Sequence, residues 1–222
     1  METPQIPAPL DVPAAIAARR STKDFNSQGI DPELLQRILD LTTEAPSSWN
    51  LQPWRIVVVD DDATKEKLHQ ACFQQRQLLE AAVTLVFAVD VEAWQQDMAP
   101  IIDQAQTVGA WPPSYCESAR QAIPGGQNAL SKMGRLREYA IKDAMIAATH
   151  CVLAATSFGL QSTYMNGWQE EAVKQVIGAA GRDEIAIAVV IVLGYSDQVV
   201  SHPGRVPQRN TVFQGRLPEA GS

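Results

Sequence analysis

The stretch that organises this chain is residues 45–54, which read APSSWNLQPW. It lies between a helical pattern over residues 31–44 and a β-branched run at residues 56–59, so it joins two elements. Pro46 and Pro53 fix φ and stiffen the backbone, while the serines, amides and indoles offer hydrogen-bonding and stacking groups. Rigid polar loops on a scaffold commonly bind ligands. The alternative is a connecting turn whose serines cap a helix and whose tryptophans pad the core.

Helices are predicted on both sides of this loop. Asp11 caps a short helix with Pro13 in its first turn, and Asp31 caps the helix before the loop. After the loop, three aspartates at 60–62 begin what we predict to be one long helix reaching residue 82. Residues 136–158 predict a central, alanine-rich buried helix.

Strands are predicted at residues 55–59, 83–89, 160–165 and 185–193. The second and the last are nearly continuous apolar runs, as expected of strands buried on both faces. Helices alternating with such strands indicate a helix-covered sheet. This pattern of elements, by itself, would suggest a parallel, doubly wound sheet.

The chain divides into a proline-rich arm over residues 1–10 and a single domain over residues 11–222. Within the domain, residues 91–137 lack clean periodicity and predict a partly helical, lid-like excursion. Residues 197–222, rich in proline, predict an extended tail.

Composition excludes several classes of protein. The chain has 222 residues, a formal net charge of -7 and 45% hydrophobic residues, which is enough for a real core and unsuited to general binding of nucleic acid or anionic membrane. No apolar run reaches the roughly 18 residues of a membrane span, and the N-terminus lacks a signal-peptide pattern. Three scattered cysteines and the absence of metal-ligand spacings predict a cytoplasmic protein with no disulfide framework and no metal site.

A basic cluster follows the first helix, with Arg19, Arg20 and Lys23 around Ser21 and Thr22. Guanidinium forks and hydroxyls suit phosphate oxygens, so the cluster is a candidate anion site. The alternative is a basic helix C-terminus that is favourably placed on its own dipole.

Together, these motifs resemble the FMN-dependent nitroreductase family. The order and spacing of RRSTKDF at 19–25, the 45–54 loop, FGL at 158–160, NGW at 166–168, LGY at 193–195 and GRVP at 204–207 match that family over residues 12–213. The resemblance implies an α+β, three-layer fold with a central, mostly antiparallel sheet flanked by helices. It also implies an intertwined homodimer with two FMN sites at the interface.

The resemblance also implies which residues bind FMN. Arg19 and Ser21, with Arg205 from the tail, would hold the phosphate, and Lys23 would lie near the pyrimidine edge of the ring. The loop would reach the flavin from the other subunit. The full set of implied FMN-binding residues is Arg19, Arg20, Ser21, Lys23, Pro46, Ser47, Ser48, Asn50, Gln74, Gln77, Met165, Asn166, Gly167 and Arg205.

The chain also departs from the family pattern. Asn166 stands where family members often carry an acid, Gln77 stands near a frequent lysine, and Pro203 replaces a second phosphate-binding base that Arg209 could substitute for. Trp94, Trp111 and Tyr115 could line an aromatic acceptor site or could simply be packed.

The resemblance implies a ping-pong NAD(P)H oxidoreductase that reduces nitroaromatics, quinones or similar electron-poor small molecules, with NADH or NADPH as donor and no side chain required as acid or base. Other flavin chemistry on the same scaffold, such as dehalogenation, enoate or azole redox reactions or flavin fragmentation, stays open. An FMN-binding or redox-sensing module without turnover and a binder of some other phosphate ligand are further alternatives.

Overall fold

Two apolar segments form the centre of one sheet in the computed structural model, which describes residues 8–218. β2 (Val83–Asp90) pairs with β4 (Ile185–Gly194), β1 (Trp54–Val59) lies outside β2, and β3 (Gln161–Met165) lies outside β4. Every pair in this order, β1-β2-β4-β3, is antiparallel. The sheet confirms the architecture that the resemblance implies and corrects the parallel arrangement that the residues alone suggested.

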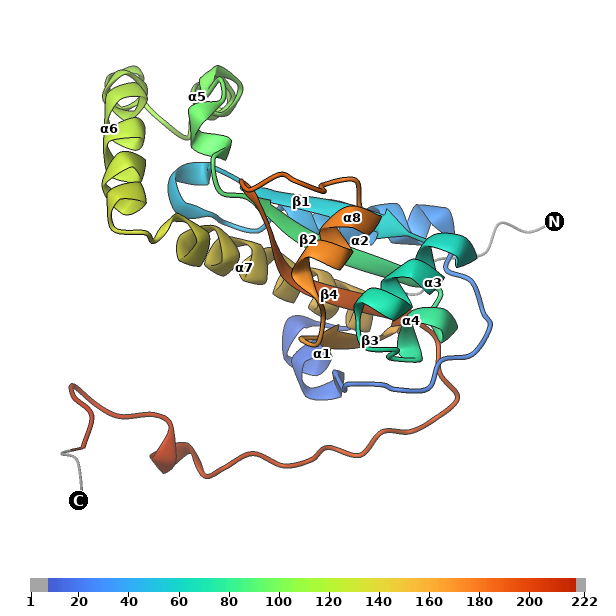
Figure 1. Cartoon of the computed structure of the whole chain (residues 1–222). Helices are drawn as coiled ribbons and strands as arrows, with labels where there is room; N and C mark the ends of the chain where they lie inside the picture. Colours follow the sequence, from blue (N-terminus) through green and yellow to red (C-terminus); the bar gives the residue numbers. More distant parts are fainter. Residues whose placement is uncertain (1–7, 219–222) are drawn as a thin grey trace.

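Helices cover both faces of the sheet (Figure 1). One face carries α1 (Val12–Ala18), α2 (Pro32–Thr43) and α7 (Leu136–Ser157). The other carries α3 (Asp62–Ala71), α4 (Gln77–Glu80) and α8 (Glu170–Val176). Because the two central strands are covered on both sides, all their residues are buried, which is why their sequences lack the alternation of a half-exposed strand.

Side chains of the central strands alternate between two cores. Leu85 and Phe87 pack against α2 and α7, whereas Val86 and Ala88 pack against α3 and α4. In β4 the alternation is interrupted where Phe87 pairs with Val189 and Ala88 pairs with Ile187. The extra residue between these partners is a β-bulge, which lets β4 keep apolar groups on both faces.

The predicted caps are present. The side chains of Asp11, Asp31 and Asp61 accept backbone N–H groups at the starts of α1, α2 and α3. α7 is largely buried and made of small residues, and the chain leaves it through Gly159 at a φ of +86°.

The long helix predicted over residues 62–82 is interrupted. α3 ends at Ala71, and Phe73 and Gln74 follow with φ of +56° and +57°, before the short α4. Left-handed conformations at two consecutive non-glycine residues are uncommon, and sequence patterns do not reveal them. Gln74 therefore lies in a turn and not on a helix.

The excursion at residues 91–137 is more helical than its sequence suggested. After a 3₁₀ turn, η2 (Ala93–Gln95), it forms α5 (Ala99–Thr107) and α6 (Pro113–Lys132), which stand out from one end of the molecule (Figure 1). α6 continues as one α-helix on both sides of Pro124, which lies inside it. A small apolar cluster of Leu51, Ala119 and Ile123 joins α6 to the 45–54 loop.

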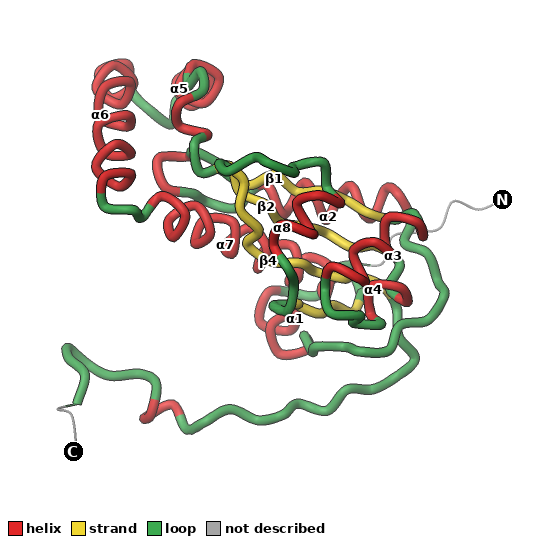
Figure 2. The backbone as a smooth tube through the Cα atoms, in the orientation of Figure 1, coloured by secondary structure: helices red, strands yellow, loops and turns green. Residues whose placement is uncertain are grey.

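After β4 the chain runs as a long extended tail with one short 3₁₀ turn, η3 (Gln208–Asn210) (Figure 2). All its residues from 201 to 218 are exposed. Most of the predicted proline-rich arm, residues 1–7, and the last four residues of the tail lie outside the described residues. Within residues 8–218, the helices are all too short or too polar to span a bilayer.

Candidate functional site

An open pocket of about 620 Å³ lies between α1, α7 and β3. Its polar lining includes Arg19, Ser21 and Asn166, and its apolar wall includes Met145 and Val152 of α7. One guanidinium nitrogen of Arg19, Nη1, is buried and has no hydrogen-bond partner among the described residues. A buried cationic donor without a partner indicates a place where an anion is bound.

The segment after α1 is held in place by the sheet. Ser21 forms a parallel bridge with Ser162, and the backbone N–H of Thr22 donates to the Ser162 carbonyl at 3.1 Å. The hydroxyl of Thr163 donates to the Thr22 carbonyl. The end of α1 is therefore fixed along the edge of β3, which directs Arg19 and Ser21 into the same pocket.

The two adjacent arginines differ in what they bind. The guanidinium of Arg20 donates to the carbonyls of Ala17 and Arg19 at 2.6 and 2.7 Å, so Arg20 caps its own helix. Arg20 therefore fits the alternative interpretation of the basic cluster, in which a basic residue lies at the C-terminus of its own helix. Arg19 still fits the interpretation as an anion site. Lys23, four residues further along the chain, is exposed.

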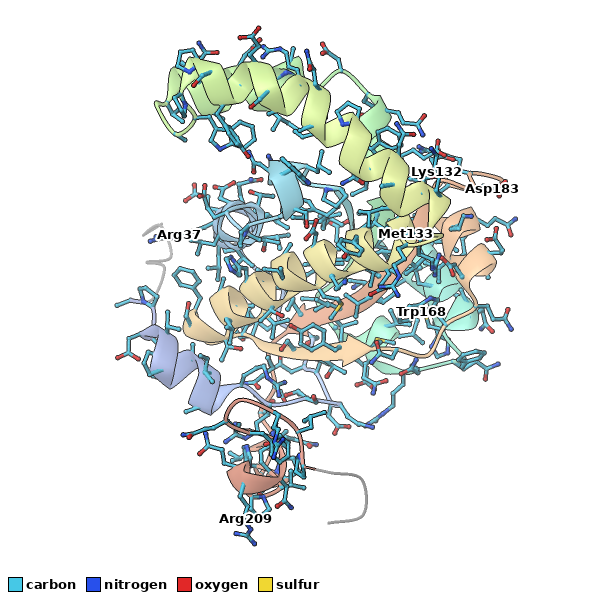
Figure 3. All side chains as sticks on the ribbon, turned by 90° about the vertical axis from the view of Figure 1, so that its left-hand side faces the viewer. Arg37, Lys132, Met133, Trp168, Asp183 and Arg209 are labelled. Atoms are coloured by element: carbon cyan, nitrogen blue, oxygen red, sulfur yellow. The ribbon has the colours of Figure 1, made fainter. Side chains whose placement is uncertain are left out.

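The tail brings more positive charge towards α1. Desolvation lowers the pKa of His202, and so do the positive charges of three arginines close to it, Arg20, Arg205 and Arg19. His202 thus lies within electrostatic range of Arg19 and Arg20, whereas the guanidinium of Arg205, three residues along the tail, donates to the Gly204 carbonyl. Arg209, the suggested substitute for a base at Pro203, points away from the body of the molecule (Figure 3).

The end of β3 is clamped by the turn after α3. Gln75 Nε2 donates to the Gly167 carbonyl at 2.9 Å and to the Cys72 carbonyl at 3.0 Å. A Cβ at Gly167 would lie 3.3 Å from both Gln75 and Phe73, so the close approach favours glycine. Gln74 is exposed in the same turn.

Two of the predicted site residues point inward. Met165 is 1% exposed and Gln77 is 8% exposed, and both belong to the buried interior. Neither side chain is therefore available to a ligand at the surface of this chain.

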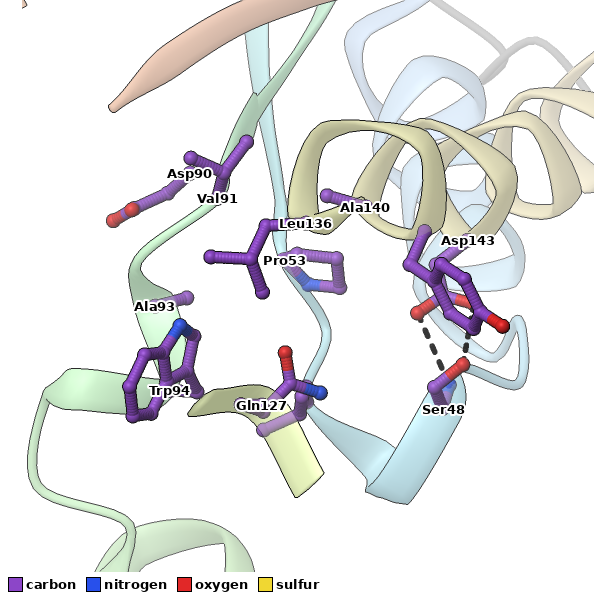
Figure 4. A pocket seen from close by; sticks show the side chains of 12 residues that line it. Ser48, Pro53, Asp90, Val91, Ala93, Trp94, Gln127, Leu136, Ala140 and Asp143 are labelled. Atoms are coloured by element: carbon purple, nitrogen blue, oxygen red, sulfur yellow. Dashed lines mark hydrogen bonds between the residues drawn. The ribbon is translucent and has the colours of Figure 1, made fainter. Parts of the chain in front are cut away.

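The 45–54 loop is tightly wound. Trp49, Asn50 and Gln52 have φ of +56°, +56° and +46°, and Ser47 Oγ accepts the Gln52 N–H at 2.9 Å. Ser48 donates from its N–H and its hydroxyl to the two carboxylate oxygens of Asp143 on α7, at 3.1 and 3.2 Å (Figure 4). The serine hydroxyls expected to be free are therefore both engaged within the chain.

Within one chain, the loop and the Arg19 pocket are separate. Ser48 lines a smaller pocket, of about 20 Å³, together with Trp94, Gln127 and Asp143 (Figure 4). Trp94 and Trp111 pack against the small apolar cluster under α6, and Trp111 meets Tyr115 edge-to-face at 5.1 Å. This geometry favours the packed alternative for the tryptophans.

The comparison with known proteins decides the family. The model of the nitroreductase family matches residues 16–195. The chain belongs to the nitroreductase family. Among curated proteins, it is 34% identical over 206 residues to an NADH dehydrogenase of Thermus thermophilus, covering 92% of this chain and 96% of that one.

Solved nitroreductase-like structures share the fold. A Staphylococcus epidermidis protein named "putative NAD(P)H:FMN oxidoreductase" superposes with a TM-score of 0.85 at 25% identity, covering 94% of this chain and 98% of that one. An Exiguobacterium sibiricum protein solved in complex with FMN gives a TM-score of 0.81 at 22% identity, covering 94% and 99%. At that identity the second likeness concerns the fold alone.

Sequence patterns did not single out two residues of the candidate site, Gln75 and Asp143. A signal existed for Asp143, since a carboxylate on an alanine-rich helix predicted to be buried needs a partner. Gln75 gave none, because its contact with Gly167 depends on a left-handed turn.

Two buried cysteines lie outside the Arg19 pocket. Burial raises the pKa of Cys72 to about 11 and that of Cys151 to about 12, so both thiols stay protonated. Within residues 8–218, His, Cys, Asp and Glu side chains form no cluster that could hold a metal ion.

Proposed function

We propose that this nitroreductase-family chain is an FMN-dependent oxidoreductase. It takes reducing equivalents from NADH or NADPH and passes them to nitroaromatics, quinones or similar electron-poor acceptors by a ping-pong mechanism. The observation that carries the proposal is the buried, unpartnered Arg19 nitrogen in a pocket that also contains Ser21 and Asn166. The names of similar proteins, which mention NADH, NAD(P)H and FMN, support it.

FMN supplies two-electron redox chemistry when bound, and the protein supplies binding and orientation. Arg19 and Ser21 suit a phosphate because a guanidinium fork and a hydroxyl provide charge-assisted and neutral donors. Arg205 and Arg20 add positive charge on the same side. Lys23, Gln74 and the backbone of Met165–Gly167 complete the proposed cofactor contacts, with Gln75 holding Gly167 in place.

The active form is proposed to be a homodimer in which Pro46, Ser47, Ser48 and Asn50 serve the partner's cofactor. Two observations favour this arrangement. The loop does not reach the Arg19 pocket of its own chain. An apolar groove lined by Val12, Leu41 and Leu153 lies open on the α1–α7 side, and Val12 is 66% exposed.

The test begins with the visible absorption spectrum of the purified full chain with added FMN, followed by anaerobic NADH or NADPH. Flavin bands that bleach with nucleotide and return with a quinone or nitroaromatic are the expected result. A chain that remains colourless after saturation with FMN and gel filtration would overturn the proposal.

Two variants probe the site itself. Arg19→Ala and Arg205→Ala should lower FMN occupancy with the fold retained, because both are proposed to hold the phosphate. Arg182→Ala is the control, since Arg182 is exposed and pairs with Glu184. Wild-type occupancy in both test variants would remove the assignment of the phosphate site.

A second function is an FMN-binding or redox-sensing module without efficient turnover. Pro203 in place of a base, and Arg209 directed away from the body, favour it because they leave the phosphate fewer cations. Bound flavin that is not reduced by either nucleotide would support this alternative over the enzyme.

A further inference from the structure

Asp143 is a buried carboxylate that the proposed chemistry does not use. It is 6% exposed on α7, and its two oxygens accept the N–H and the hydroxyl of Ser48 (Figure 4). These bonds tie the middle of the 45–54 loop to the helix layer over a sequence separation of 95 residues.

The loop needs such a tie because its backbone is strained. Three of its residues, Trp49, Asn50 and Gln52, are non-glycine residues in the left-handed region. Conformations of this kind persist where surrounding contacts over-determine them, and they gather at ligand sites. The other serine of the loop, Ser47, cannot replace these bonds. Its hydroxyl oxygen accepts the Gln52 N–H, which belongs to the same loop.

The charge of Asp143 is not explained by folding alone. Desolvation raises its pKa, and the hydrogen bonds from Ser48 and the charge of Lys142 only partly offset this effect. A neutral side chain of the same shape would avoid the desolvation penalty of the ion. The carboxylate does have one effect that an amide would not reproduce. Its two oxygens accept both the N–H and the hydroxyl of Ser48, whereas an amide offers only one acceptor oxygen to these two donors.

α7 connects this anchor with the Arg19 pocket. Met145 and Thr149 line that pocket, and Asp143 faces the loop. At 100° per residue, Asp143 and Met145 are on opposite sides of the helix, so one rigid element sets the position of both groups.

We propose that Asp143 is a positioning residue for the FMN site, which fixes the 45–54 loop so that Ser47, Ser48 and Asn50 can contact FMN bound by a second copy of this chain. The inference rests on the proposed function and assigns a role to a residue outside the expected cofactor contacts. Asp143 acts through Ser48 and touches neither FMN nor acceptor.

The experiment compares Asp143→Asn with Glu138→Gln, which removes the same charge from an exposed position on the same helix. For each full-length variant, the FMN dissociation constant is measured by quenching of flavin fluorescence, and Tm is measured without FMN. We expect Asp143→Asn to weaken FMN binding about tenfold, because bonds to a charged acceptor are about twice as strong as neutral ones. Its Tm should stay close to that of the wild type, because the desolvation penalty that the amide avoids offsets the weaker bonding to Ser48.

Ser48→Ala and the double variant keep the inference testable if Asp143→Asn folds poorly. If Asp143 acts through Ser48, the double variant should weaken FMN binding less than the product of the single effects. Three results would overturn the inference: unchanged FMN affinity in Asp143→Asn, an affinity loss that is matched by a fall in Tm, or independent effects of the two residues. Failure of the wild type to bind FMN would instead remove the proposed function as well.

Discussion

At the scale of single residues, neighbouring side chains of one type take different roles. Arg19 and Arg20 look equivalent in the sequence, yet Arg20 caps α1 while Arg19 leaves a buried nitrogen without a partner. An unsatisfied buried donor costs about 1–3 kcal/mol of folding free energy. Binding of an anion at this nitrogen, as proposed, would remove that cost.

Replacing Arg19 by methionine should have opposite effects with and without ligand. In Arg19→Met without FMN, the free energy of unfolding should stay the same or rise by about 1 kcal/mol, because the unpaired donor is removed. The stabilisation by FMN, about 2.7 kcal/mol at a hundredfold excess over Kd, should be lost. Urea titrations with and without FMN measure both effects. A large loss of stability without FMN would show that Arg19 has a structural partner.

At the scale of elements, one glycine decides how β4 ends. A Cβ at Gly194 would lie 2.9 Å from Phe25 and 3.1 Å from the backbone nitrogen of Ala82. The segment after the basic cluster therefore packs on the sheet only because this position has no side chain. Phe25 and Gly194 were seen in the sequence as parts of separate motifs, and their contact was not predictable from either.

Gly194→Ala should lower the free energy of unfolding by about 1–3 kcal/mol, because the backbone of Ala82 cannot move aside easily. Gly125→Ala is the matched control, since nothing lies within 4 Å of its position in α6. The control should be stabilising by about 0.5–1 kcal/mol through helix propensity. Thermal melts of both variants give the comparison, and equal effects would contradict it.

Glu170 joins three elements and gives a pH dependence. Burial raises its pKa, but a bidentate pair with Arg137 at 2.9 and 2.8 Å and the N–H of Ile187 at 3.0 Å outweigh burial and lower it. A lowered pKa means that the unfolded chain binds the proton more readily. The stabilisation is therefore complete above the usual glutamate range and is lost as the pH falls below it.

Glu170→Gln should accordingly be less stable than the wild type near pH 7, by about 1 kcal/mol because the site is partly exposed. The difference should shrink as the pH falls below about 4. Urea titrations at several pH values measure it, with Glu117→Gln as a control for an exposed carboxylate. A difference that is constant with pH would show that the charge of Glu170 is not involved.

At the scale of the whole molecule, a single chain leaves apolar side chains on α1 and α2 and a long C-terminal tail exposed. Residues 201–218 are all exposed. Val12 and Leu41 are 66% and 42% exposed in the open groove, and Ile16, which lines the Arg19 pocket, is 56% exposed. Monomers rarely leave such contiguous surface open. This surface supports the proposed homodimer.

Val12→Asp should weaken that dimer. The change places a charge in the apolar groove, yet an acidic residue in the first turn of α1 suits the helix dipole, so the monomer should remain folded. Val108→Lys is the control, because Val108 is 64% exposed at the end of α5 and a cation suits that position. Sedimentation velocity of the three proteins measures the association. A wild type that sediments as a monomer would contradict the proposed dimer.

The sequence by itself determined the elements of this fold and, through its spaced motifs, the family. The caps of α1, α2 and α3, the apolar strands and the buried α7 depend on neighbouring residues, which is why local patterns predict them. It also marked the basic cluster and the polar loop as candidate sites.

Local patterns could not decide the direction of the strands, because strands covered on both faces have the same apolar pattern whether they run parallel or antiparallel. The antiparallel order was implied by the family resemblance alone, and the tertiary structure confirms it. Only the tertiary structure decided that Arg19 and not Arg20 is available to an anion, that Gln75 clamps Gly167, and that Asp143 holds Ser48. Each of these facts depends on contacts between residues far apart in the sequence, whose approach is set by packing.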